Sequence, residues 1–236
     1  TQNTNQAYIV PGGTGITGGG DGWGVYLPSI SLQNGFEPKD TRKKSTIMTD
    51  GDFYPELLKN QGGFLYKKIY SSTAANFRKY IVGSAAERND VFFMRTSQNT
   101  IILRYSDILL MNSEAILAGA SSTTSTAALS SFNEVRARAG LPAKTVLTRD
   151  ELFNERRVEF ALEGQYFFDL KRRGLTEATA VISQQEVGFY SDDARTELIS
   201  RKITPGSNYF ELPIPQSAID TNPSLLEAPV PFNFNN

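Results

Sequence analysis

The stretch from Thr148 to Gly174 constrains the fold most, because it combines a helix start signal with an unusual number of charges. Thr148 followed by Glu151 is a capping box, in which the threonine oxygen accepts a hydrogen bond from the backbone N–H of Glu151 and the glutamate reaches back to the N–H of Thr148. Helices often end at a glycine in the left-handed conformation. The sequence therefore predicts a helix that begins at Thr148 and runs to Gly164.

Charged residues interrupt the apolar surface of this predicted helix. Glu155, Glu159 and Glu163 recur at every fourth position and share one face, and Arg156 and Arg157 lie between them. The face could be solvated, as most charged runs are. Its carboxylates could also be catalytic, although no other feature of the sequence supports acid–base chemistry. We favour a third interpretation, a structural network of partly buried arginine–carboxylate pairs.

Two missing residue types exclude several kinds of chemistry. The 236 residues include no cysteine and no histidine, which excludes disulfides and thiol catalysis and removes the usual general base and the commonest transition-metal ligand. Lys and Arg number 24 and Asp and Glu number 25, so the net charge is −1. We expect no nucleic-acid partner, because such proteins carry a basic surface. The sequence contains no apolar run of about 18 residues, so it predicts no transmembrane helix.

Residues 101–140 have the pattern of a helical hairpin. Apolar residues recur at spacings of three and four from Tyr105 to Ile116 and again from Ala128 to Ala139, and a glycine follows each run. Two helices joined by a short turn match a TPR-like unit, although one copy does not prove a repeat. With the helix that begins at Thr148, this hairpin should form the core.

The rest of the chain is predicted to be less regular. We expect residues 1–100 to form a loop-rich region with the candidate ligand face, and residues 101–236 to form a helical core with a C-terminal tail that wraps over it, the two parts making one continuous domain. The tail carries six prolines, so it cannot be helical throughout. We expect it to lie extended, anchored by Leu212, Ile214 and Leu225. The predicted fold class is mainly α: a TPR-like helical scaffold with long irregular loops and an extended proline-rich C-terminal segment.

A glycine-rich segment near the start of the chain contains the candidate ligand site. The single tryptophan, Trp23, lies between two glycines with Tyr26 close by, so it has little local core to pack into. Aromatic faces stack on the C–H faces of sugar rings, and Asp21, Gln33 and Asn34 could bind the sugar hydroxyls. We predict these five residues as ligand-binding residues. The alternatives are a flexible surface loop, a buried anchor or an interface residue.

No pattern in the sequence requires a cofactor or a metal ion. The glycine spacing of residues 13–18 formally matches a dinucleotide fingerprint, but no adequate strand precedes it and no helix start follows it. Asp50, Asp52 and Glu56 could form an oxygen-rich calcium cluster, although their spacing does not fit an EF-hand. A polar turn around Gly51 explains them more simply. We therefore assign no cofactor and no metal site.

Four parts of the sequence resemble the SusD/RagB family, and they occur in the family's order. ERRVEFALEGQYFFDLKRRG resembles the hallmark segment, and ILRYSDILLMNSEAIL followed by SFNEVRARAGLP resembles the helix pair that precedes it. ELPIPQSAIDTNPSLLEAP is similar to the C-terminal signature, and FEPKDTRKK to a weaker segment near the front. The resemblance covers Phe36 to Pro229. In the family the matching Asp-x-Arg, here Asp40 and Arg42, looks structural, a turn with an ion pair.

The resemblance implies a function at a cell surface. Members of that family are glycan- or nutrient-binding lipoproteins of the bacterial outer membrane and partners of TonB-dependent transporters. The chain is accordingly expected to bind an oligosaccharide or another nutrient without catalysis or cofactor, as part of a surface-exposed outer-membrane lipoprotein, and to deliver the ligand to a SusC-like TonB-dependent transporter.

The family also differs from this chain in one respect. Its members are longer and begin with a lipoprotein signal, an acylated cysteine and TPR-like repeats, none of which is found at Thr1. We interpret the chain as the C-terminal half of a longer protein. It would then contact the membrane only through a lipid anchor on the missing N-terminal part.

Two other functions are compatible with the sequence. A TPR-like protein-interaction scaffold would expose a groove lined by the helices of residues 104–139. A glycoside hydrolase, the less favoured of the two, needs two carboxylates that face each other at about 5–9 Å, for which Asp169 and Glu163 are the pair to test. Arginine partners and shielding from solvent at both carboxylates would argue against that function.

Overall fold

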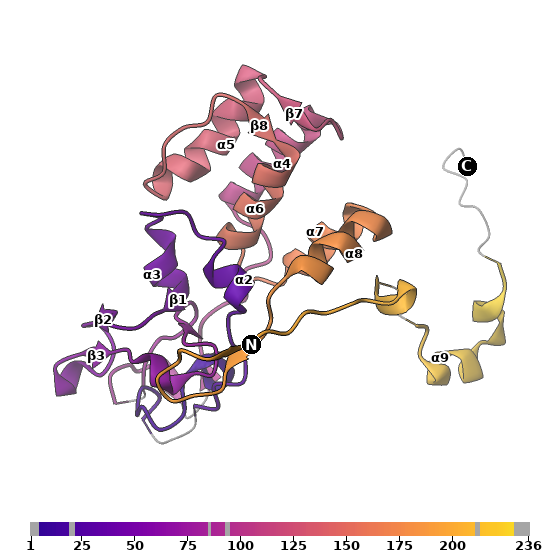
Figure 1. Ribbon diagram of the computed structural model, residues 1–236. Coiled ribbons are helices and arrows are strands. Elements are labelled where there is room, and N and C mark those ends of the chain that lie inside the picture. Colours follow the sequence, from indigo (N-terminus) through magenta and orange to yellow (C-terminus); the bar gives the residue numbers. More distant parts are fainter. Residues whose placement is uncertain (1–4, 19–21, 85, 93–94, 211–212, 229–236) are drawn as a thin grey trace.

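The computed structural model describes residues 5–18, 22–84, 86–92, 95–210 and 213–228. Helices account for most of the regular structure, and each described strand is two residues long. In Figure 1, helices α4, α5 and α6 form one end of the molecule and the irregular first part of the chain forms the other. No helix within the described ranges is both long and apolar enough to span a membrane.

The predicted helical hairpin is present, and a third helix packs against it: α4 (Tyr105–Leu117), α5 (Thr126–Arg138) and α6 (Arg149–Glu159). Their facing sides share one apolar cluster that includes Leu110, Phe132 and Leu152. Ser113 lets α4 and α5 approach closely, and its hydroxyl donates to the carbonyl oxygen of Ala128 at 2.9 Å. Two short strands, β7 (Ser122–Thr123) and β8 (Leu147–Thr148), pair antiparallel and join the turn after α4 to the start of α6.

Helix α6 begins as predicted but ends early. The Oγ1 atom of Thr148 accepts from the Glu151 N–H at 3.2 Å, and the Glu151 carboxylate accepts from the Thr148 N–H at 3.0 Å. The prediction that the helix runs to Gly164 is wrong, because it ends at Glu159 and Leu162 takes a positive φ of 65°. A leucine in that conformation is unfavourable by itself. Tertiary contacts therefore hold this turn.

Replacing Thr148 with alanine is expected to lower the free energy of unfolding by about 1 kcal/mol, because the cap of α6 would lose its side-chain acceptor. Urea denaturation of both proteins measures the change. Thr145→Ala is the matched control, since Thr145 is exposed and lies in the same connection. An equal loss of stability in the two variants would contradict the capping role.

The first hundred residues build a second apolar cluster with little regular structure. Ile47, Tyr66 and Phe77 are buried in it together with Val158 of α6, so α6 contacts both clusters. The sequence predicted a loop-rich region over residues 1–100, and the structure adds two short helices within its first 35 residues. The helices of this part are α1 (Asn5–Ile9), α2 (Ile30–Gln33) and α3 (Arg42–Thr46), with 3-10 turns η1 (Lys59–Gln61) and η2 (Lys68–Tyr70). The antiparallel strand pairs are β1 (Ile47–Met48) with β4 (Asn76–Phe77), β2 (Phe53–Tyr54) with β3 (Phe64–Leu65), and β5 (Val91–Phe92) with β6 (Arg95–Thr96).

A third, smaller apolar cluster follows α6. Leu170, Ala178, Ile182 and Phe210 are buried in it. Phe167 stacks on Phe210 with ring centroids 5.9 Å apart. The elements of this part are α7 (Tyr166–Arg172), α8 (Leu175–Gln184), the antiparallel pair β9 (Phe189–Tyr190) and β10 (Leu198–Ile199), and the 3-10 turn η3 (Ser207–Phe210).

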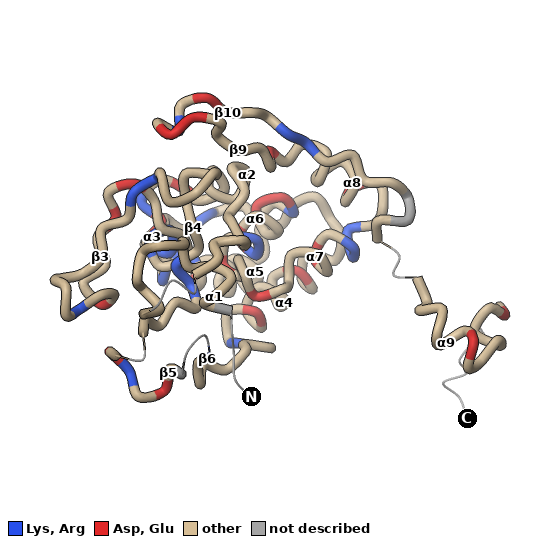
Figure 2. The backbone as a smooth tube through the Cα atoms, turned by 90° about the horizontal axis from the view of Figure 1, so that it is seen from below, with Lys and Arg blue, Asp and Glu red and all other residues tan. Residues whose placement is uncertain are grey.

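The C-terminal segment differs from the prediction that it wraps over the helices. Its elements, α9 (Gln216–Thr221) and η4 (Pro223–Leu226), stand apart from the rest of the chain in Figures 1 and 2. Ile214 and Leu225 are 45% and 40% exposed, so they do not anchor the segment on the helices. The third predicted anchor, Leu212, lies outside the described residues. The predicted division of the chain at residue 100 stays a prediction.

Candidate functional site

Three aromatic side chains gather around α1, and we call them the aromatic group (Tyr8, Trp23 and Tyr26). The rings of Tyr8 and Trp23 meet edge to face with centroids 5.1 Å apart, and the rings of Tyr8 and Tyr26 stack at 5.3 Å. Trp23 and Tyr26 are 49% and 52% exposed. The group therefore presents two large aromatic side chains to solvent while their mutual contacts hold them in place.

Backbone hydrogen bonds fix the segment that carries Trp23 and Tyr26. The N–H of Trp23 donates to the carbonyl oxygen of Ala7 at 2.8 Å. The N–H groups of Val25 and Tyr26 both donate to the carbonyl oxygen of Tyr8, at 2.8 and 3.0 Å. These contacts attach the segment to the end of α1, which positions both exposed rings.

A glycine permits this close approach, and one member of the group was missed by sequence reasoning. A Cβ at Gly22 would lie 2.7 Å from a methyl carbon of Val10 and 2.9 Å from its carbonyl oxygen, so a larger residue would displace the segment. Tyr8 was not predicted as a site residue. Its two ring contacts depend on the tertiary fold, which no local pattern in the sequence indicates.

The polar residues predicted for the ligand site have different surroundings. The side-chain nitrogen of Gln33 donates to the carbonyl oxygens of Pro28 and Thr73, at 3.1 and 2.9 Å, so it ties two backbone segments together. Asn34 is exposed at the end of α2. Asp21 lies outside the described residues. Trp23 and Tyr26 are therefore linked through their contacts with Tyr8, whereas the hydrogen bonds of the Gln33 amide go to Pro28 and Thr73 and not to the aromatic group.

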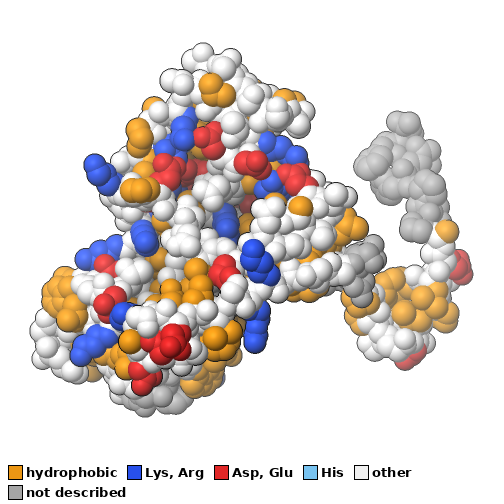
Figure 3. Space-filling model, viewed as in Figure 1, with side chains coloured by type: hydrophobic (Ala, Val, Ile, Leu, Met, Phe, Trp, Pro, Cys, Tyr) orange, Lys and Arg blue, Asp and Glu red, His pale blue; other side chains and the backbone are white. Residues whose placement is uncertain are grey.

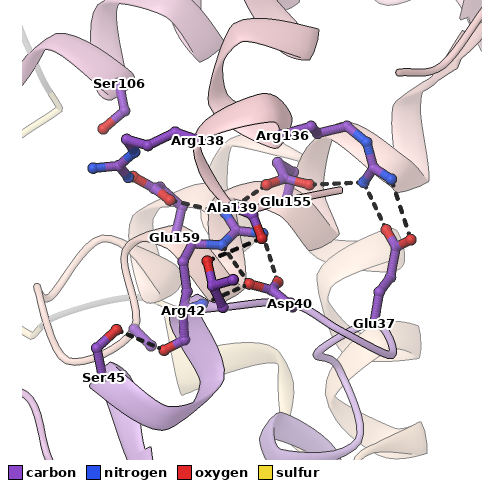
Figure 4. A network of polar contacts seen from close by, with 12 residues as sticks. Glu37, Asp40, Arg42, Ser45, Ser106, Arg136, Arg138, Ala139, Glu155 and Glu159 are labelled. Atoms are coloured by element: carbon purple, nitrogen blue, oxygen red, sulfur yellow. Dashed lines mark hydrogen bonds and ion pairs between the residues drawn. The ribbon is translucent and has the colours of Figure 1, made fainter. Parts of the chain in front are cut away.

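A network of ion pairs joins α6 to α3 and α5 (Figure 4). The guanidinium of Arg42 donates to both oxygens of Asp40, at 3.0 Å from Nε and 2.7 Å from Nη2. Its Nη1 atom donates to Glu155 at 2.5 Å and to Glu159 at 2.8 Å. The favoured interpretation of the charged helix as a structural arginine–carboxylate network is confirmed. The structural ion pair expected for Asp40 and Arg42 is confirmed as well.

Further cations complete this network around a cavity of about 490 Å³. Arg104 and Arg138 both bind Glu159, and Lys79 and Arg104 both bind Glu163. Figure 3 shows basic and acidic side chains next to each other on this face of the molecule. Each carboxylate that lines the cavity is thus neutralised within the protein, which makes this a structural site.

Two glutamates of α6 have pKa values that are shifted in opposite directions by their surroundings. Burial by itself would raise the pKa of Glu159, but hydrogen bonds from Arg104 and Arg42 outweigh it and lower that pKa to about 2. Burial has the larger effect at Glu155, whose pKa is raised despite the attraction of Arg42 and Arg136. The same helix face therefore holds carboxylates with opposite pKa shifts.

The carboxylate pair proposed for a glycoside hydrolase fails its test. Asp169 is 4% exposed, and both of its oxygens accept from Nε of Arg156 at 3.0 Å. The side chain of Glu163 is 3% exposed and is bound by Arg104 and Lys79. Both carboxylates are shielded and paired, so neither is free to act as a general acid or base in the way that glycoside hydrolysis requires.

The acidic residues considered for calcium make contacts within the protein. One oxygen of Asp52 accepts from the N–H of Thr49 at 2.7 Å, and Asp50 accepts from the N–H of Lys68 at 2.9 Å. Among the residues that the structure describes, no group of three or more acidic side chains is placed to hold a metal ion. The interpretation of Asp50 and Asp52 as a polar turn accounts for their contacts.

Comparison with known proteins supports one family. The model of the SusD family matches residues 2–230. A SusD-like protein of Bacteroides ovatus is 31% identical over 254 residues, which cover 94% of this chain and 46% of that protein. The SusD-like protein P2 of Formosa agariphila is 30% identical over 184 residues, which cover 67% of this chain and 34% of that protein.

Solved structures agree with the fold. A crystal structure with a xylogluco-oligosaccharide matches 100% of this chain and 52% of that chain, with a TM-score of 0.84 and 29% identity. The surface glycan-binding protein A from Bacteroides uniformis, at 23% identity and a TM-score of 0.66, shows the same fold over 96% of this chain and 46% of its own length. The chain thus spans about half the length of these proteins.

These matches confirm two predictions from the sequence. The fold is mainly α with a TPR-like helical scaffold and long irregular loops. The resemblance carried by the segment around α6 also identified the correct family. On the family model and on the Bacteroides ovatus relative together, the chain belongs to the SusD family.

Proposed function

We propose that this chain binds a glycan through the aromatic group and that it is part of a surface-exposed outer-membrane lipoprotein, which passes the glycan to a SusC-like TonB-dependent transporter. The observation that carries the proposal is the exposure of Trp23 and Tyr26, 49% and 52%, on a segment that is hydrogen-bonded to α1. Exposed aromatic patches commonly mark binding surfaces. The related structure that contains a xylogluco-oligosaccharide supports a glycan as the ligand.

The mechanism of binding is stacking combined with hydrogen bonding. The apolar C–H face of a sugar ring packs against the indole of Trp23 and the ring of Tyr26. Tyr8 contacts both rings, at centroid distances of 5.1 and 5.3 Å, so little side-chain freedom is lost when the ligand binds. A site with few contacts gives modest affinity, which suits a protein that must release its ligand to a transporter.

The predicted polar residues are proposed as hydrogen-bonding partners of the glycan hydroxyls on the basis of their chemistry. The exposed amide of Asn34 offers both a donor and an acceptor, and the carboxylate of Asp21 accepts from hydroxyls. Both protons of the Gln33 amide are directed to backbone carbonyls, which leaves Oε1 as its contribution to a ligand. The proposed function includes no bond cleavage and no cofactor.

Replacing Trp23 with alanine is expected to weaken binding of a xylogluco-oligosaccharide about tenfold, because an aromatic contact contributes about 1.5 kcal/mol. Isothermal titration calorimetry with this oligosaccharide, after a screen of a glycan panel, measures the change. Tyr105→Ala is the matched control, since Tyr105 is 66% exposed but lies on α4. Equal affinities of the Trp23→Ala variant and the wild type would move the site away from the aromatic group.

The apolar face of α4 favours a second candidate function, a scaffold that binds another protein segment. Tyr105, Ile108 and Met111 follow each other at the spacing of one helix face and are 66%, 46% and 40% exposed. The predicted interaction groove lay on this part of the chain. Absence of glycan binding to the wild type would favour this second function over the first.

A further inference from the structure

Arg157 differs from the other arginines of α6. The helix carries three arginines. Arg149 pairs with Glu177 at 2.6 Å, and Arg156 pairs with two buried aspartates. Arg157 is half-buried, and within the described part of the chain no carboxylate lies at ion-pair distance from it. A cation removed from water without a counter-ion is unfavourable, so its position calls for an explanation.

Neutral groups occupy the surroundings of Arg157. One Nη2 proton points to Oε1 of Gln185 at 3.4 Å, and the guanidinium carbon lies 5.0 Å from the centre of the Tyr166 ring. Burial lowers the pKa of the Arg157 guanidinium, which is the direction expected when no acid compensates the loss of water. A long hydrogen bond and a ring face do not replace a carboxylate.

Arg157 lines a cavity of about 490 Å³, which we call the Arg157 pocket. This volume falls in the range of about 300–1,000 Å³ that is typical of small-molecule sites. Most of the wall is apolar or aromatic, and among the residues that the structure describes no Asp or Glu lines it. Besides Arg157, the lining residues that matter for binding are Ser29, Phe77, Phe160, Tyr166, Phe167 and Gln185.

Hydrogen-bond donors exceed acceptors among the polar side chains of the pocket. Arg157 has five N–H donors, one of which is directed to Gln185. The oxygen of Tyr166 accepts from the Gln185 amide, so its own O–H is available to donate. Ser29 already accepts from the N–H of Leu32 at 3.1 Å, and its hydroxyl proton is likewise available. The complementary ligand group is therefore an acceptor, and next to a guanidinium it is an anion.

We propose that the Arg157 pocket binds a carboxylate carried on a ring of about monosaccharide size. The planar guanidinium matches the two oxygens of a carboxylate, and the hydroxyl of Tyr166 adds a third donor. Phe77, Phe160 and Phe167 supply the apolar wall for the ring. Two kinds of compound present this chemistry, a uronic acid sugar and an aromatic carboxylic acid.

This site is separate from the aromatic group although the two are close along the chain. Leu27 of the pocket directly follows Tyr26, but none of the three residues of the aromatic group lines the pocket. Because three residues of extended chain span at most about 10 Å, Ser29 of the pocket lies within about that distance of Tyr26 along the backbone. The proposal does not depend on glycan binding at Trp23, and a Trp23→Ala variant should bind the carboxylate with unchanged affinity. Failure of one site can thus be distinguished from failure of the other.

Calorimetric titration of the 236-residue chain with D-glucuronate and with benzoate tests the proposal. D-glucose and benzyl alcohol are the matched neutral compounds. At least one carboxylate is expected to bind, with an affinity at least tenfold higher than that of its neutral counterpart. Preference for glucuronate would identify a sugar acid as the ligand class, and preference for benzoate would identify an aromatic acid.

Three variants assign the binding to Arg157. Arg157→Gln is expected to weaken carboxylate binding at least tenfold, and Lys171→Gln, which removes an exposed positive charge on α7, is expected to leave it unchanged. Gln185→Glu places a carboxylate beside Arg157 and should abolish binding of an external carboxylate. This variant supplies the missing counter-ion, so it keeps the test decisive if Arg157→Gln does not fold.

The proposal would be overturned by any of three results. These are the absence of carboxylate binding to the wild type, equal binding of the acids and their neutral counterparts, and wild-type affinity in a folded Arg157→Gln or Gln185→Glu variant.

Discussion

Replacing Arg156 with methionine is expected to lower the free energy of unfolding by about 3–5 kcal/mol, because the change breaks a buried ion pair from one side. Arg156 is 3% exposed. Its Nη1 atom donates to Asp107 at 2.8 Å, and its Nε atom donates to both oxygens of Asp169 at 3.0 Å. Asp169 would keep Arg172, at 2.7 Å from Nη2, whereas Asp107 would lose its arginine partner. Asp107 is 5% exposed, so water cannot easily replace that partner.

The adjacent arginine provides a matched control for this experiment. Arg157→Met makes the same chemical change one position later, where no paired carboxylate is left behind. Urea denaturation of the wild type and both variants is expected to show a large loss only for Arg156→Met. Equal thermal midpoints for Arg156→Met and the wild type would refute a structural role of this ion pair. An oligosaccharide-binding assay of Arg156→Met should show no effect beyond that of the lost stability.

Lowering the pH from 7 to 3 is expected to reduce the free energy of unfolding by about 2 kcal/mol through Glu159 alone. Its pKa is about 2 in the folded protein and 4.5 without the fold. The folded state therefore binds this proton less tightly than the unfolded chain does. The stabilisation is complete above the unfolded pKa and is lost as the pH falls toward the folded pKa. Glu159 is 4% exposed, so solvent screens its ion pairs only weakly.

Comparison of variants separates the contribution of Glu159 to the pH dependence of stability from the contributions of other carboxylates. Glu155 acts in the opposite direction, since its pKa is raised by burial and its protonation is easier in the folded state. We expect the stability difference between pH 7 and pH 3 to shrink by about 2 kcal/mol in Glu159→Gln relative to the wild type. Glu134→Gln changes an exposed glutamate of α5 and should retain the wild-type difference. An undiminished pH dependence in Glu159→Gln would show that the ion pairs of Glu159 do not stabilise the fold.

Features that depend on neighbouring residues were predicted from the sequence. The capping box of Thr148 and Glu151 formed as expected, because both of its hydrogen bonds close within three residues. The hairpin of α4 and α5 followed from apolar residues at helical spacing. The exposure of Trp23 also agrees with its position between two glycines, which offer it no local packing partner. Its role in binding stays a prediction.

Features that depend on distant residues were not predictable in the same way. Nothing in the spacing of the charges indicated that Arg42 would bind Glu155, which lies 113 positions away. The contact of Tyr8 with both exposed rings and the early end of α6 were likewise missed. The predicted wrapping of the proline-rich tail was wrong for the same reason. Prolines exclude a continuous helix, but they do not decide which surface the chain contacts.

The sequence by itself determined the helical scaffold, the family and the presence of an arginine–carboxylate network, because helix propensity, capping and charge content are local properties. Only the tertiary structure decided which charge neutralises which. It paired Arg156 with Asp107 and Asp169 and left Arg157 beside Gln185 in an apolar pocket. Two adjacent arginines point to different sides of one helix. The part of the protein that packs against each side determines whether the arginine there meets a carboxylate.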